Sequence, residues 1–123
     1  MLMNTIRPVA AFLSVAGALL LSATAADAHA NLVSSVPAKN ATTASPGMIT
    51  LHFSEALEMK VSSFKLTDTD GKPVAIKSAK APDTKSLAAA PAAPLSPGLY
   101  TISWTSMGDD AHKLTGTLSF TVK

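Results

Sequence analysis

The chain contains no cysteine among its 123 residues. This absence excludes a disulfide framework and any metal site built from thiolates. Arginine occurs once, at Arg7, and the other basic residues are lysines spread along the chain. A net charge of +2 without a basic cluster does not predict a nucleic-acid-binding surface. Apolar residues at helical spacing are also scarce after the first 28 residues, which argues against a helical domain.

Residues 1–28 have the layout of a secretory signal peptide. Arg7 precedes an apolar run over residues 9–21, and small residues follow it. The run is too short to span a bilayer comfortably, and this combination is typical of an exported precursor. We therefore predict a signal peptide over 1–28 and one domain over 29–123, about 95 residues long.

The expected cleavage point gives one histidine a special position. The tripeptide Ala26-Asp27-Ala28 has the small residues that a signal peptidase needs, which predicts cleavage before His29. Two other tripeptides with suitable small residues would expose Ala26 or Asn31 instead. Cleavage before His29 would place an imidazole and a free α-amine on the same residue.

The segments after residue 28 alternate apolar and polar residues, the pattern of half-buried β-strands. In "MITLHFS" the apolar positions face one way, whereas Thr50 and His52 face the other, so we expect an ordinary solvent-facing His52. In "LYTISWTS" the same pattern places Trp104 on the inward face. "SPG" at residues 45–47 and 96–98 marks a turn before a strand. The sequence predicts an all-β sandwich of about seven strands.

Asp110 and His112 are two residues apart in "DDAHKLTG". Residues at this spacing in an extended chain point to the same face, so the carboxylate and the imidazole lie side by side. Such a pair is most often an ordinary polar contact at a strand end. Its meaning changes if the mature chain begins at His29, because an amine and a second imidazole then become available.

Two imidazoles, one amine and one carboxylate form a donor set of three nitrogens and one oxygen. The amine and imidazole hold their protons weakly near neutral pH, so a metal displaces them readily. Nitrogen-rich tetragonal sites suit Cu(II), although Zn(II) accepts the same atoms in a tetrahedral arrangement. The absence of thiolates and the scattered methionines give no indication of a Cu(I) site.

Four segments resemble the periplasmic copper-resistance proteins of the CopC type. They are "HANLVSSVPA", "ITLHFSEAL", "LSPGLYTISW" and "DDAHKLTGTLSFTV". The last is similar to the family pattern Asp-Gly-His-x-x-x-Gly-x-x-x-Phe-x-Val. The positions that match it are Asp110, His112, Gly116, Phe120 and Val122.

The resemblance implies an immunoglobulin-like β-sandwich, or Greek-key barrel, that binds one Cu(II) per chain. The implied ligands are His29, Asp110 and His112. Glu55, which follows the "HFS" strand, corresponds to a family glutamate close to the copper. The resemblance thus implies that Glu55 is a weak axial ligand or hydrogen-bonds the amine or a metal-bound water.

The same resemblance implies a monomeric periplasmic protein without enzymatic activity, which sequesters copper for resistance or homeostasis or delivers it to a membrane transporter of the CopD type. This chain departs from the family at Ala111, where glycine is usual, and a positive φ there would strain alanine. Asp109 adds a neighbouring carboxylate, which we expect to point away from the site. The segment "LAAAPAAPLSPG" lacks the methionines that hold Cu(I) in some members, so no Cu(I) site is expected.

Two other classes of function fit parts of the sequence. A metal-free structural or adhesive immunoglobulin-like domain is the appropriate interpretation if cleavage removes His29. A copper oxidase with an N-terminal-histidine brace also uses such a residue, but this chain is short. Such oxidases bind polysaccharide on a flat aromatic face. This chain has only one tryptophan and one tyrosine, and both are expected to face inward.

Overall fold

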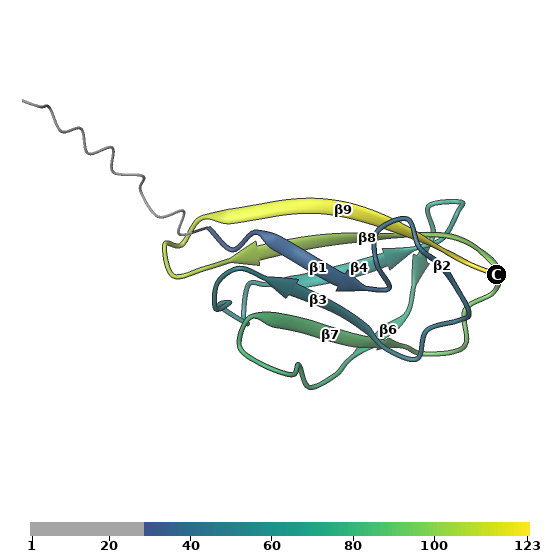
Figure 1. Ribbon diagram of the computed structural model, residues 1–123, viewed down its shortest axis with the longest axis horizontal. Helices are drawn as coiled ribbons and strands as arrows, with labels where there is room; N and C mark the ends of the chain where they lie inside the picture. Colours follow the sequence, from purple (N-terminus) through teal and green to yellow (C-terminus); the bar gives the residue numbers. More distant parts are fainter. Residues whose placement is uncertain (1–28) are drawn as a thin grey trace, which may run out of the picture.

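A computed structural model describes residues 29–123, which form two β-sheets packed face to face (Figure 1). The predicted signal peptide over 1–28 lies outside the described residues. Within the described part of the chain there is no helix, and hence no helix that could cross a membrane. The predicted all-β sandwich is confirmed.

The two sheets contain four and five strands. All neighbouring strands run antiparallel except β2 and β9, which pair in parallel. The smaller sheet has, in spatial order, β1 (Leu32–Val36), β3 (Ile49–Phe53), β7 (Ser86–Pro91) and β6 (Ile76–Ser78). The larger sheet has β2 (Thr42–Thr43), β9 (Lys113–Val122), β8 (Gly98–Met107), β4 (Ser63–Thr67) and β5 (Pro73–Val74).

The described residues thus form nine strands where the sequence predicts about seven. The difference is accounted for by β2 and β5, which are two residues long each. An alternation of period two cannot be recognised in two residues, so tertiary pairing alone defines these strands.

The core lies between the sheets and contains the apolar residues that alternation assigns to the inner faces. On β3, Ile49 and Leu51 are completely buried, and on β9 Phe120 is completely buried. Trp104 on β8 also faces inward but is only partly buried. Its indole meets the ring of Phe53 edge-on, with 5.3 Å between the ring centroids. The predicted inward face of β8 is therefore correct, with Trp104 at the margin of the core.

The expectation that His52 is an ordinary solvent-facing residue is wrong. Its side chain is half-buried, and Nδ1 lies 2.8 Å from Oγ of Ser86, which is completely buried. The Ser86 hydroxyl donates to Oδ1 of Asp83 at 2.8 Å, so it accepts its other hydrogen bond from Nδ1–H of His52. Sequence alternation gives the face of a residue, but it does not reveal the loop that covers that face.

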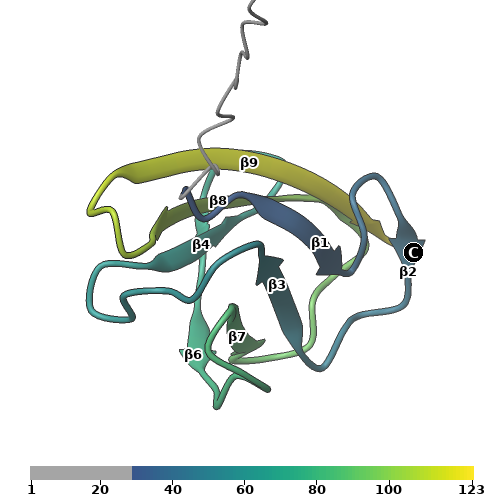
Figure 2. The same ribbon diagram turned by 60° about the vertical axis from the view of Figure 1, so that its left-hand side comes forward.

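One end of the sandwich brings together segments that are distant in the sequence. The residues entering β1, the end of β8 and the start of β9 lie at this end, on the left in Figure 1, and Figure 2 shows the same grouping from a second direction. Ser54, just after β3, also reaches this end, since its N–H donates to the carbonyl of Asn31 at 2.8 Å. This end carries every residue of the candidate site.

Candidate metal centre

The hairpin loop between β8 and β9 presents Asp110 and His112. The loop turns through a hydrogen bond from the N–H of Ala111 to the carbonyl of Gly108, 3.1 Å long. Oδ1 of Asp110 accepts a hydrogen bond from the N–H of His112 at 3.1 Å, a local bond typical of aspartate in turns. This bond fixes the carboxylate with its second oxygen, Oδ2, directed at the imidazoles.

Ala111 has the backbone conformation that the usual glycine would adopt freely. Its φ is 61°, in the left-handed region that disfavours residues with a Cβ atom. The strain suspected from the sequence at Ala111 is therefore present. The loop nevertheless holds Asp110 and His112 together.

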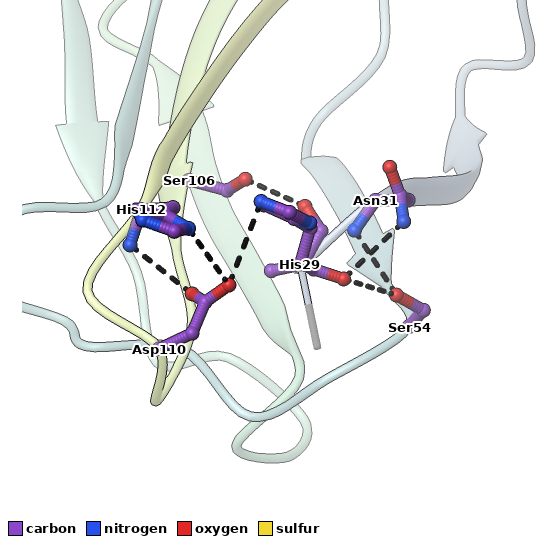
Figure 3. Close-up of polar contacts among 7 residues, drawn as sticks. His29, Asn31, Ser54, Ser106, Asp110 and His112 are labelled. Carbon is purple, nitrogen blue, oxygen red and sulfur yellow. Dashed lines mark hydrogen bonds and ion pairs between the residues drawn. The ribbon is translucent and has the colours of Figure 1, made fainter. Parts of the chain in front are cut away.

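His29 comes from the opposite end of the described chain and completes the group. Oδ2 of Asp110 lies 3.5 Å from Nε2 of His29 and 3.3 Å from Nδ1 of His112 (Figure 3). The two imidazole rings are stacked, with centroids 5.2 Å apart and planes inclined by 18°. One carboxylate oxygen therefore contacts both rings, and the rings approach each other closely.

The geometry of these three side chains fits a single metal ion. One donor atom from each lies within 4.8 Å of the others. Two ligands bound at about 2.0–2.2 Å to one ion are themselves about 3–4 Å apart, so small side-chain rotations suffice to close the site. Asp110 is 19% exposed, His29 38% and His112 69%, so an ion can reach the group from solvent.

The sequence contains two other carboxylates near the predicted metal site, those of Glu55 and Asp109. Glu55 follows β3 and is exposed, and among residues 29–123 it is not one of the three whose donor atoms lie together. Asp109 is exposed and is likewise outside the group. The role of Glu55 beside the metal remains a prediction.

Sequence analysis missed two serines that contact the backbone next to His29. Ser54 Oγ donates to the carbonyl of His29 at 3.1 Å, and Ser106 Oγ donates to the carbonyl of Ala30 at 2.6 Å. Ser106 had a recognisable signal, since it is a polar residue at an inward-facing position of its strand. Ser54 had none, because its partner becomes apparent only from the tertiary structure.

The fold and this group of side chains define a small β-sandwich with three side chains that could hold a metal ion gathered at one end. The CopC domain family model matches residues 32–123, and the chain belongs to the CopC family. This result confirms the resemblance identified from the four sequence segments.

Individual relatives agree with this family. The chain is 38% identical over 119 residues to copper resistance protein C of Pseudomonas syringae pv. tomato, covering 91% of this chain and 94% of that protein. It is 42% identical over 104 residues to copper resistance protein C of Escherichia coli, covering 78% and 82% respectively. The crystal structure of PcoC, a methionine-rich copper resistance protein from Escherichia coli, superimposes with a TM-score of 0.74 at 42% identity, covering 78% of this chain and 100% of PcoC.

Proposed function

We propose that this protein binds one Cu(II) ion per chain through His29, Asp110 and His112, in a mature form that begins at His29. The observation that carries the proposal is the convergence of these three side chains, whose donor atoms lie within 4.8 Å of one another. The names of the relatives, copper resistance protein C, support copper as the metal.

The N-terminal amine of the processed chain is the fourth donor. Together with Nδ1 of its own ring, the amine of His29 closes a chelate ring around the ion. Nε2 is the nitrogen that approaches Asp110 in the structure, so this chelation requires the imidazole of His29 to rotate about its Cβ–Cγ bond. Such a rotation is inexpensive because the side chain is 38% exposed.

The donor set favours Cu(II) over Cu(I). Three nitrogens and a carboxylate oxygen suit a tetragonal Cu(II) site, whereas Cu(I) prefers thiolates and thioethers. PcoC is described as methionine-rich. In the present domain the methionines are Met48, Met59 and Met107, and none lies in the proline-rich segment at 87–98. We therefore propose no separate Cu(I) site.

The proposed cellular role depends on export of the chain and on this metal site. Removal of residues 1–28 would deliver a monomeric protein to the periplasm, where it sequesters Cu(II) for resistance or homeostasis, or delivers it to a membrane transporter of the CopD type. Glu55 completes the coordination as a weak axial ligand or orients a metal-bound water. A carboxylate among the ligands stabilises Cu(II) against reduction, which argues against an oxidase with a histidine brace.

A competition titration tests the metal site. The chain beginning at His29 is titrated with Cu(II) against a chelator, and the same chain with one residue added before His29 is titrated in parallel. We expect markedly weaker binding by the extended chain, because its residue 29 has an amide nitrogen in place of an amine. Equal affinities would contradict the proposal, as would mass spectrometry showing that the exported protein begins at another residue.

A further inference from the structure

The three residues that lead into β1 are held by side-chain hydroxyls from both sheets. The carbonyl of His29 accepts a hydrogen bond from Oγ of Ser54 at 3.1 Å, and the carbonyl of Ala30 accepts one from Oγ of Ser106 at 2.6 Å. Figure 3 shows the two hydroxyls on opposite sides of this short segment. Consecutive carbonyls are thus fixed by serines from two different parts of the chain.

Ser54 and Ser106 are themselves well anchored. Ser106 lies on β8 and is completely buried. Ser54 is half-buried just after β3, and besides donating to His29 its Oγ accepts a hydrogen bond from the N–H of Asn31 at 3.0 Å. The methyl group of Ala30, between these contacts, is completely buried in the core. The segment is therefore fixed at the carbonyls of His29 and Ala30 and by the buried side chain of Ala30.

This arrangement is unusual for residues that begin a domain. The first residues of a domain ordinarily fray unless something ties them down. Residues 29–31 precede the first strand, β1, and the bond from the N–H of Ser54 to the carbonyl of Asn31 links their backbone to the chain just after β3, the neighbouring strand of the same sheet. The two serine hydroxyls fix the peptide planes that follow His29, and so restrict where its nitrogen and ring can lie.

We propose that Ser54 and Ser106 are positioning residues for the N-terminal donor pair of the copper site. The inference rests on the proposed function, since it assigns these serines a role toward the amine of His29. By holding the carbonyls of His29 and Ala30, they keep the amine within reach of Asp110 and His112 before the metal arrives. Copper binding then requires less ordering of the chain, and preorganisation of this kind raises affinity.

The test compares Ser54→Ala and Ser106→Ala with the unmodified domain, each in a form beginning at His29 and a form with one residue added before it. In the form beginning at His29, each alanine variant should bind Cu(II) about 10-fold more weakly or worse, the usual loss when a group that orients a ligand is removed. In the extended form the amine is absent from residue 29, so the same substitutions should matter much less. This non-additivity would not arise from a general loss of stability.

Two further variants make the comparison specific. Ser54→Thr keeps the hydroxyl and should restore the affinity that Ser54→Ala loses. Ser86→Ala is the matched control, because Ser86 is completely buried and makes two side-chain hydrogen bonds, to His52 and Asp83 rather than to residues 29–31. It should leave the copper affinity unchanged.

Hydrogen exchange of the metal-free protein provides a second measurement. The N–H of Asn31 donates both to Oγ of Ser54 and to the carbonyl of His29, each at 3.0 Å. Ser54→Ala removes the first of these acceptors, so exchange of that amide should accelerate, whereas Ser86→Ala should not affect it. Unchanged affinity in both alanine variants, or an equal loss in the short and extended forms, would overturn the inference. Equal binding by the short and extended unmodified chains would instead contradict the proposed function.

Discussion

The indole ring of Trp104 lies directly against the backbone of Gly116, its cross-strand partner on β9, with no room for a side chain between them. A Cβ atom added at Gly116 would lie 2.4 Å from Cζ2 and 2.7 Å from Cε2 of the indole. The glycine therefore allows the single tryptophan of the chain to close the margin of the core.

Replacing Gly116 with alanine should consequently destabilise the domain. The added methyl group must displace a rigid ring that also packs edge-on against Phe53, and overpacking of this kind costs about 1–3 kcal/mol. Urea unfolding followed by tryptophan fluorescence measures the loss. The native emission should also shift, because Trp104 is the only tryptophan. A Cβ atom added at Gly47 would meet nothing within 4 Å. Gly47→Ala is therefore the control and should not reproduce either effect.

Replacing Ala111 with glycine should stabilise the metal-free protein. An alanine in the left-handed region, here with φ at 61°, costs about 1–2 kcal/mol, and glycine adds a smaller entropic cost of about 0.5–1 kcal/mol. The expected net gain is about 0.5–1 kcal/mol in the free energy of unfolding. Ala93→Gly, in an exposed loop with a normal φ, should be neutral or destabilising. A stability loss in Ala111→Gly would show that the loop is not strained at this residue.

If Asp110 and His112 are the ligands proposed above, replacing either should weaken copper binding strongly. His112→Ala deletes a donor atom of the group, and Asp110→Asn replaces the anionic carboxylate with a neutral amide, whose oxygen is a weaker donor. We expect affinity to fall by more than about 100-fold in each case, beyond the usual effect of losing a supporting residue. Competition titration measures the change. Asp109→Asn alters a neighbouring exposed carboxylate and should bind as the unmodified domain does. If Asp109→Asn were the more damaging change, the ligand assignment would be wrong.

Copper should stabilise the chain that begins at His29 against unfolding. A ligand that binds only the folded state adds about 2.7 kcal/mol when its free concentration is 100 times its dissociation constant. Calorimetry with and without Cu(II) should therefore show a higher Tm for this form. A smaller shift is expected at the same copper concentration for a chain with one extra residue before His29. No shift in either form would favour a metal-free structural domain.

The carboxylate of Asp83 should make stability depend on pH in the acid range. The hydroxyl of Ser86 foremost, and then the N–H of Lys85, donate to Asp83 and hold its pKa below the ordinary value of 3.8. Because the pKa is lowered in the folded state, this stabilisation is complete above pH 3.8 and disappears as the pH falls through the lower folded-state value.

Substituting Asp83 with alanine should thus destabilise the domain slightly at pH 7 and less at about pH 3, because below pH 3.8 the unfolded state binds this proton more readily than the folded state does. Denaturant unfolding at both pH values gives the comparison. Asp109→Ala, at an exposed position, serves as the reference. This account would be contradicted if the loss in free energy of unfolding caused by Asp83→Ala were larger at low pH than at pH 7.

The amino-acid pattern by itself determined the sandwich class and the faces of the main strands. Ile49 and Leu51 on β3, and Phe120 on β9, are buried as alternation requires, because successive side chains of a strand must point to opposite faces. The sequence also grouped Asp110 and His112, and the predicted cleavage before His29, with the resemblance to CopC proteins, added His29 to them. The two hairpin residues lie in a turn with φ 61° at Ala111, however, and not in the extended strand that the spacing argument assumed. These inferences needed only spacing, residue chemistry and sequence similarity.

Only the tertiary structure decided how the distant segments meet. It brought the ring of His29 against that of His112, paired the hydroxyls of Ser54 and Ser106 with the first carbonyls of the domain, and covered His52 through Ser86. These contacts depend on which strand ends lie at the same end of the sandwich. That placement follows from the register and packing of whole sheets, which a pattern of period two within one strand does not contain.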